Sequence, residues 1–214
     1  MSGVDREFAA LNYVDPHSLA VRPGGEGATG GVPSYPVRRI AIAGHSYVGR
    51  LNLSRTLYQP GNLQVRRFAK PGGTITSFRT SGAWDALVRW RPDLTFLVLG
   101  GNDIVDGVCV WTLVGRLADL VLELEEETGG RCHIVGIECR DNPRGISADE
   151  FKRVKNAVNR GLKRVHRIRG RYTNMQFYHE YLSWDGVHLD NRGTERLLRH
   201  LLAETRRHFH IIQG

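Results

Sequence analysis

Short apolar runs alternate with longer amphipathic segments from about residue 37 to the end of the chain. The clearest strand pattern is the apolar run at residues 94–99, which Gly100 and Gly101 end. Such a run is typical of a strand that is buried on both faces of a parallel sheet. Other β-prone runs predict four further strands, at residues 39–43, 63–68, 132–137 and 175–178.

The segments between these strands repeat their apolar residues every three or four positions, a spacing that places them on one face of a helix. One helix is predicted at residues 110–127, ended by Gly129 and Gly130, and a second around residues 151–165. A third is predicted from Asn191, as its cap, to about His208. Alternating strands and helices predict a parallel sheet with helices on both faces and with ligands bound beyond the C-terminal ends of the strands.

The first 36 residues lack this patterning and are rich in glycine and proline. Such a segment cannot bury enough apolar surface to offset the entropy lost on ordering. We therefore predict a flexible leader at residues 1–36 and one folded domain at residues 37–214. A domain of that length is large enough to bury a substantial core.

The composition, 41% hydrophobic and 24% charged, is ordinary for a soluble globular protein. No apolar stretch approaches the roughly 18 residues that a membrane span needs, and charged residues 5–7 stand where a secretory signal would be apolar. We therefore expect no membrane span and an intracellular, cytoplasmic location. The three cysteines form no disulfide or zinc-binding pattern, so we expect buried thiols and neither a metal nor a cofactor.

The formal net charge of +8 is concentrated in one segment. Residues 151–171 contain nine Lys and Arg and no acid, so the rest of the chain has 21 basic against 22 acidic residues. Two interpretations stay open for this segment. It is either the solvated face of an amphipathic helix or a binding surface for a phosphate-rich partner such as nucleic acid.

The first predicted strand leads into Gly44-His45-Ser46, which places a serine hydroxyl and free helix amides in the crevice. A phosphate-binding P-loop would need lysine and then serine or threonine after Gly49, where the chain has Arg50 and Leu51. The nucleophile elbow of the α/β-hydrolases would need glycine at position 48, where the chain has valine. Taken alone, this serine could equally be a helix cap.

Three other loops bring further candidate groups to the same edge of the predicted sheet. Gly72 and Gly73 follow the second strand, and Asn102 follows the third, within Gly100-Gly101-Asn102-Asp103. Near the C-terminus, Asp185 and His188 are three residues apart, a spacing that allows the carboxylate to bind the imidazole and fix its tautomer.

In order, spacing and flanking sequence these four blocks resemble those of the SGNH (GDSL-like) hydrolases, over about residues 38–208. The resemblance implies a flavodoxin-like three-layer α/β/α sandwich with a five-stranded parallel sheet. It also implies hydrolysis of an ester or thioester through an acyl-enzyme, without a metal. By the same resemblance Ser46 attacks the carbonyl, His188 is the base and Asp185 orients His188. The implied oxyanion hole consists of the amides of Ser46 and Gly73 and the side chain of Asn102.

Block I of the family usually contains Gly-Asp-Ser, whereas this chain has His45 before Ser46. We interpret His45 as a local hydrogen-bonding brace and not as the catalytic base. The sequence thus predicts a serine esterase that acts on small, acetyl-type esters of a small molecule, lipid or carbohydrate. One alternative is a binding module with little turnover because of His45. Another is a nucleic-acid-associated esterase domain of a retroelement polyprotein, since the leader, the basic segment and Gly-His-Ser are similar to such modules.

Overall fold

The computed structural model describes residues 36–53, 63–175 and 179–210 of the chain. All but the last residue of the predicted leader lie outside these ranges. The boundary between leader and domain therefore stays a prediction.

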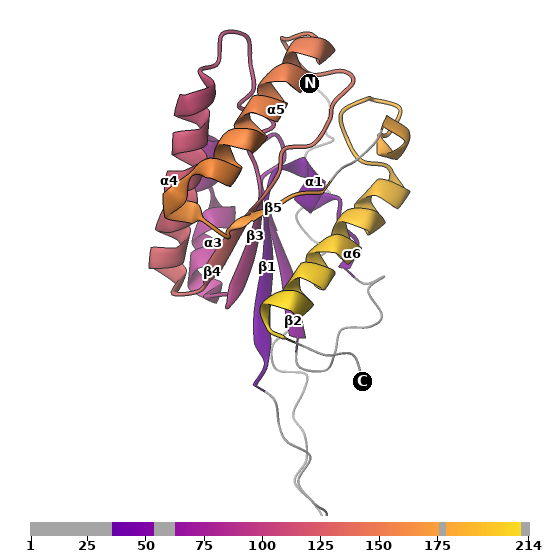
Figure 1. Cartoon of the computed structure of the whole chain (residues 1–214). Helices are drawn as coiled ribbons and strands as arrows, with labels where there is room; N and C mark the ends of the chain where they lie inside the picture. Colours follow the sequence, from indigo (N-terminus) through magenta and orange to yellow (C-terminus); the bar gives the residue numbers. More distant parts are fainter. Residues whose placement is uncertain (1–35, 54–62, 176–178, 211–214) are drawn as a thin grey trace, which may run out of the picture. The chain divides into compact units, whose positions relative to one another are not determined.

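Five parallel strands form one sheet in the order β2-β1-β3-β4-β5, with β1 in its interior (Figure 1). The strands are β1 (Arg38–Gly44), β2 (Leu63–Ala69), β3 (Leu94–Val98), β4 (Arg131–Val135) and β5 (Tyr172–Thr173). The first four agree with the predicted strands to within two residues.

The position predicted for the fifth strand is wrong. It was expected at residues 175–178, but β5 lies upstream at Tyr172–Thr173, while Met175 belongs to no strand and residues 176–178 are outside the described ranges. The reason is its length, since β5 pairs only through two residues with the end of β4. So short an edge strand leaves no alternating pattern in the sequence.

Three long helices confirm the predicted pattern, and a short helix begins at Ser46 as the motif implied, whereas α2 and α3 are shorter helices that the pattern did not show. The helices are α1 (Ser46–Gly49), α2 (Ile75–Arg79), α3 (Gly82–Trp90), α4 (Val110–Thr128), α5 (Ala148–Arg164) and α6 (Asn191–His208). The predicted cap of α6 is wrong by one residue, because the side chain of Asp190 accepts from the Gly193 backbone N–H at 2.7 Å.

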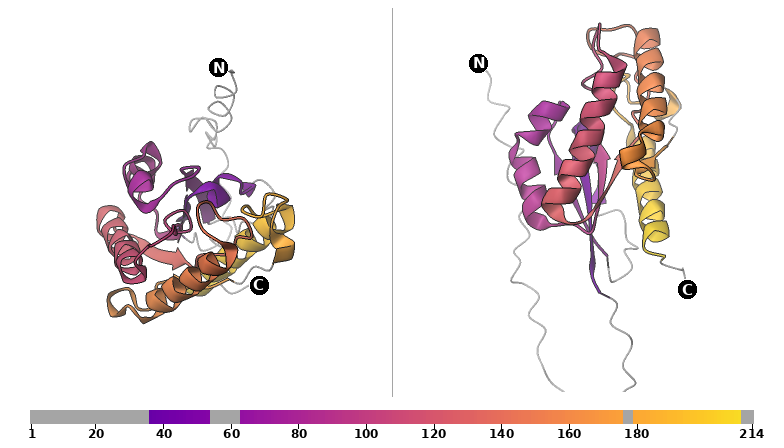
Figure 2. Two further views of the ribbon diagram at one scale, coloured as in Figure 1. Left: turned by 90° about the horizontal axis from the view of Figure 1, so that it is seen from above. Right: turned by 60° about the vertical axis from the view of Figure 1, so that its left-hand side comes forward.

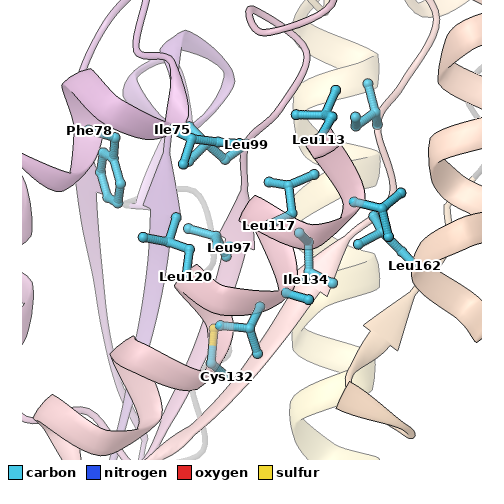
Figure 3. Close-up of a cluster of buried hydrophobic side chains, with 14 of the residues drawn as sticks. Ile75, Phe78, Leu97, Leu99, Leu113, Leu117, Leu120, Cys132, Ile134 and Leu162 are labelled. Carbon is cyan, nitrogen blue, oxygen red and sulfur yellow. The ribbon is translucent and has the colours of Figure 1, made fainter. Parts of the chain in front are cut away.

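Two apolar clusters cover the two faces of the sheet and make the fold a three-layer sandwich. The larger cluster joins the sheet to α2, α3, α4 and α5, and part of it is drawn in Figure 3. The smaller cluster joins the opposite face to α1 and α6. The left-hand view of Figure 2 shows α3 and α4 on one side of the strands and α6 on the other. The predicted α/β/α fold with five parallel strands is therefore confirmed.

Within the described residues no helix combines the length and apolarity that crossing a membrane would need. The expectation of three buried thiols holds only in part. Cys132 is buried and Cys139 is half-buried, but Cys109 is exposed beside the start of α4.

The strand ends are aligned where β1 meets its two neighbours. Gly44, the last residue of β1, is level with Ala69 of β2 and with Val98 of β3. Its carbonyl accepts from Lys70 N–H at 2.9 Å, and the next N–H, of His45, donates to the Val98 carbonyl at 3.1 Å. The loops that follow β1, β2 and β3 therefore start at one level, which is the edge predicted to hold the site.

Leu117 offers a test of the larger cluster, because its side chain is fully buried within it, under α4 (Figure 3). We expect Leu117→Ala to lower the free energy of unfolding by about 2–5 kcal/mol, through lost burial and the cavity left behind. Leu122→Ala, on the same helix but only half-buried, is the matched control and should cost much less. Urea denaturation of both variants measures this, and equal losses would contradict the assigned packing.

Candidate active site

The structure brings together three side chains that the sequence places far apart. Ser46 is the first residue of α1, directly beyond β1, whereas Asp185 and His188 lie in the loop before α6. His188 Nε2 lies 3.0 Å from Ser46 Oγ, and His188 Nδ1 lies 2.6 Å from Asp185 Oδ2. The imidazole thus lies within hydrogen-bond distance of a carboxylate on one side and a hydroxyl on the other.

The carboxylate of Asp185 is held by its own loop. Its Oδ1 accepts from the backbone N–H groups of Val187 and His188, both at 2.9 Å, and its Oδ2 faces the imidazole. Burial raises the pKa of Asp185, but the hydrogen bonds from His188 and Val187 outweigh it and lower the pKa to about 2. An ionised Asp185 favours the tautomer with the proton on Nδ1, which leaves Nε2 as an acceptor facing Ser46.

The three groups expected to form an oxyanion hole differ in their present bonding. No acceptor among the described residues engages the backbone N–H of Ser46. The N–H of Gly73 donates to the Lys70 carbonyl at 2.9 Å, and Asn102 Nδ2 donates to the Gly73 carbonyl at 2.9 Å. A side-chain amide has two N–H groups, so Asn102 keeps a second donor. Their joint function as an oxyanion hole stays a proposal.

Asp103 links two of the loops at this edge. Both of its carboxylate oxygens lie 3.1 Å from the backbone nitrogen of Ile75, the first residue of α2, which donates to them. Burial raises the pKa of Asp103, and the hydrogen bond from Ile75 acts in the opposite direction. The N-cap of α2 is Thr74, and Asp103 accepts a further N–H of the first turn from outside the helix, so it braces these two loops against each other.

Two features beside the site, a hydrogen bond from Tyr47 and the position of Arg140, could not be found from the sequence. The Tyr47 hydroxyl donates to the Val187 carbonyl at 2.6 Å, which ties the helix of Ser46 to the loop of His188. Burial raises the pKa of Tyr47 to about 12, and the positive charge of nearby Arg140 acts in the opposite direction. No sequence motif marks Arg140, because it lies in an irregular loop after β4 and meets the loop of Gly101 only in the fold.

Arg140 is buried, and its guanidinium occupies space that Gly101 leaves open. A Cβ at Gly101 would lie 2.8 Å from Arg140 Nη2. The next two residues of the loop, Asp141 and Asn142, donate their backbone N–H groups to the Gly186 carbonyl at 2.7 and 3.1 Å. The loop after β4 thus holds the loop that contains Asp185 and His188.

His45 directly precedes Ser46, but no hydrogen bond joins its ring to the Ser46 hydroxyl. Its Nδ1 accepts from the Tyr47 backbone N–H at 3.3 Å and so caps α1, and the two rings meet edge to face at 4.7 Å. Burial lowers the pKa of His45 to about 3, and the charges of Arg140 and His188 act in the same direction. A neutral, capping histidine agrees with our interpretation of His45 as a brace.

Solved structures with this fold are known, although no family model and no curated protein matches the sequence. The esterase EstA from Pseudoalteromonas sp., inhibited by monoethylphosphonate, has a TM-score of 0.61 at 14% identity, over 81% of this chain and 99% of its own. A catalytic serine-to-alanine mutant of Axe2, an acetylxylan esterase from Geobacillus stearothermophilus, has a TM-score of 0.60 at 18% identity, over 79% of this chain and 94% of its own.

A lipase/acylhydrolase from Enterococcus faecalis gives a TM-score of 0.58 at 16% identity, over 78% of this chain and 95% of its own. At these identities the similarity establishes the fold alone. The resemblance to the SGNH hydrolases is confirmed at that level, and the chemistry depends on the geometry of the site.

The depressed pKa of His45 predicts a pH dependence of stability. Between pH 3 and 6.5 the unfolded chain binds a proton at position 45 that the folded chain does not, so the free energy of unfolding falls as the pH falls. In His45→Asn the amide oxygen can still cap α1, but the titrating group is gone. We expect the variant to lose a slope of about 1.4 kcal/mol per pH unit between pH 4 and 6.

Urea denaturation at several pH values measures this slope. His133, whose pKa burial lowers to about 4, titrates in both proteins and cancels in the comparison. Identical slopes for the variant and the unmodified protein would show that position 45 is not a buried neutral histidine.

Proposed function

We propose that the chain is an SGNH-type serine esterase in which Ser46 is the nucleophile, His188 the base and Asp185 the group that orients His188. The observation that carries this proposal is the continuous contact from Asp185 Oδ2 through His188 to Ser46 Oγ, at 2.6 and 3.0 Å. A serine hydroxyl is a weak nucleophile until a base lies within hydrogen-bond reach of it, and the base in turn needs a fixed tautomer. Both requirements are met here.

The reaction proceeds in two halves. As Ser46 Oγ bonds to the ester carbonyl carbon, its proton passes to His188 Nε2 and the carbonyl oxygen becomes an oxyanion. Collapse of this intermediate breaks the bond to the alcohol, which leaves with the proton from His188, and the acyl group remains on Ser46. Water then attacks the acyl-enzyme, with His188 as base again, and releases the carboxylic acid and free Ser46.

The oxyanion is proposed to bind the free N–H of Ser46 and the second amide hydrogen of Asn102. The Gly73 N–H joins them by sharing its bond to Lys70 or by a small rotation of that turn. Each such donor is worth about 10²–10³ in rate in related chemistry. No step requires a metal or a cofactor.

The proposed substrates are small acyl esters of a small molecule, a lipid or a carbohydrate. Support for an acetyl group comes from the acetylxylan esterase among the structural neighbours, while the lipase/acylhydrolase leaves longer acyl groups open. These neighbours lend no support to a nucleic-acid partner for residues 151–171. The alternative of a binding module with little turnover is disfavoured, since His45 caps α1 and leaves the contact between Ser46 and His188 in place.

The test is hydrolysis of a chromogenic acetate ester by the purified chain. We expect Ser46→Ala and His188→Ala each to lower kcat by at least about 10³, because either change removes the activated nucleophile. Ser147→Ala, at the cap of α5, and His166→Ala, on the surface, are the matched controls and should keep full activity. Unchanged turnover in a folded Ser46→Ala variant would refute the assignment.

Tyr47→Phe tests the bond between the Ser46 helix and the His188 loop. We expect kcat to fall about tenfold or more with little change in KM. Without the hydrogen bond to Val187, the His188 loop is held less firmly and the distance between Ser46 Oγ and His188 Nε2 varies more. Tyr172→Phe is the control, since its hydroxyl binds only Asn174 among the described residues, away from the triad. Equal kcat values for the two variants would show that the Tyr47 hydroxyl does not position the site.

A further inference from the structure

The nine basic side chains of residues 151–171 do not form one uniform surface. Three of them are neutralised by acids: Arg153 by Glu150, Arg167 by Asp119 and Arg171 by Glu125. Another three are exposed and do not line the cavity described next: Lys152, Arg164 and Arg169. The last three line one cavity: Lys155, which is half-buried, and Arg160 and Lys163, which are exposed. Three of the nine cations therefore gather around one cavity.

The cavity has a volume of about 320 Å³ and lies between α5 and the segments that follow β4 and β5. Its size is within the roughly 300–1,000 Å³ that small-molecule sites occupy. Besides the three cations, its polar lining includes the amides of Asn156 and Asn174. The contact between Lys163 of α5 and the ring of Tyr172 in β5 shows that the two elements meet.

Several of the lining groups are fixed before any ligand binds. Asn159 donates to the Ile137 carbonyl and accepts from its N–H, both at 2.9 Å, which fastens α5 to the loop after β4. The Tyr172 hydroxyl donates to Asn174 Oδ1 at 2.9 Å, and Lys163 Nζ lies 5.3 Å from the Tyr172 ring centre. Fixed walls reduce the entropy that binding would cost.

The lining carries an excess of positive charge. In the part of the chain that the structure describes, no carboxylate lies within 4.0 Å of the basic nitrogens of Arg160 or Lys163, and Lys155 Nζ contacts Cys139 Sγ at 3.4 Å. Glu138 is the one acidic side chain among the described lining residues. Three cations against one carboxylate leave two charges to be neutralised, which matches a dianionic phosphate monoester better than a carboxylate.

We propose that this cavity is a binding site for a small organic phosphate, whose phosphate group is held by Lys155, Arg160 and Lys163. Hydroxyl groups of the ligand donate to Glu138 and exchange hydrogen bonds with the neighbouring asparagine amides. The volume of about 320 Å³ is enough for one sugar phosphate, and the three cations gather around one hollow, whereas a polymer backbone would follow an extended stripe of charge. None of the residues proposed for the triad is among the residues that line this cavity, and the site does not depend on the proposed esterase activity.

Calorimetric titration of the full chain at low ionic strength tests the site, with ribose 5-phosphate and inorganic phosphate as probes. We expect saturable binding of one equivalent of ribose 5-phosphate, weaker binding of inorganic phosphate, and loss of affinity as salt is added. The double variant Arg160→Gln/Lys163→Gln should bind ribose 5-phosphate at least about tenfold more weakly, since charge-assisted hydrogen bonds are lost.

The matched control is Lys152→Gln/Arg164→Gln, which removes the same charge from the same helix outside the cavity and should bind almost normally. Equal weakening in both double variants would overturn the proposal, because it would show general electrostatic attraction. Absence of saturable binding at millimolar ribose 5-phosphate would also overturn it. So would tight binding of a single-stranded oligonucleotide that both double variants weaken alike, since the charged face would then bind polymers.

Discussion

The candidate site depends on the close approach of β1 and β3 at Gly44. There the backbone has φ of 144°, and a Cβ would lie 1.9 Å from the Val98 carbonyl oxygen, so only glycine fits. The paired hydrogen bonds on either side align the ends of β1, β2 and β3. Ser46, Gly73 and Asn102 follow these three ends, so strand register brings the loops that contain them to one edge of the sheet.

The loop that contains Asp185 and His188 reaches this edge of the sheet from near the C-terminal end of the chain. It is held by backbone contacts, from Tyr47 to the Val187 carbonyl and from the loop after β4 to the Gly186 carbonyl. Asp185 fixes the loop internally and stays ionised, while His45 nearby stays neutral. The proposed base is thus paired with one carboxylate and competes with no second basic histidine for the proton of Ser46.

The sequence was sufficient for most of the fold, because long apolar runs and amphipathic helices carry their own pattern. β5 was misplaced, since its two residues are defined by pairing with β4 and not by their own composition. The residues of the proposed triad could be chosen from motif spacing and resemblance. Arg140 could not, because it lies in an irregular loop after β4 and meets the loop of Gly101 only through tertiary structure, which no sequence motif signals. The hydrogen bond from the Gly73 N–H to the Lys70 carbonyl could not be predicted either, because the spacing of the motifs does not determine the geometry of that turn.

The central claim is that Ser46 is the activated nucleophile, and covalent labelling tests it most directly. A fluorophosphonate reacts with a serine only where a base and oxyanion donors assist the attack, as in the mechanism proposed for this site. After incubation of the full chain with the reagent, digestion and mass spectrometry identify the modified residue. The account predicts one adduct per chain, on the peptide that contains Ser46. No adduct, or an adduct at another residue with Ser46 unmodified, would contradict it.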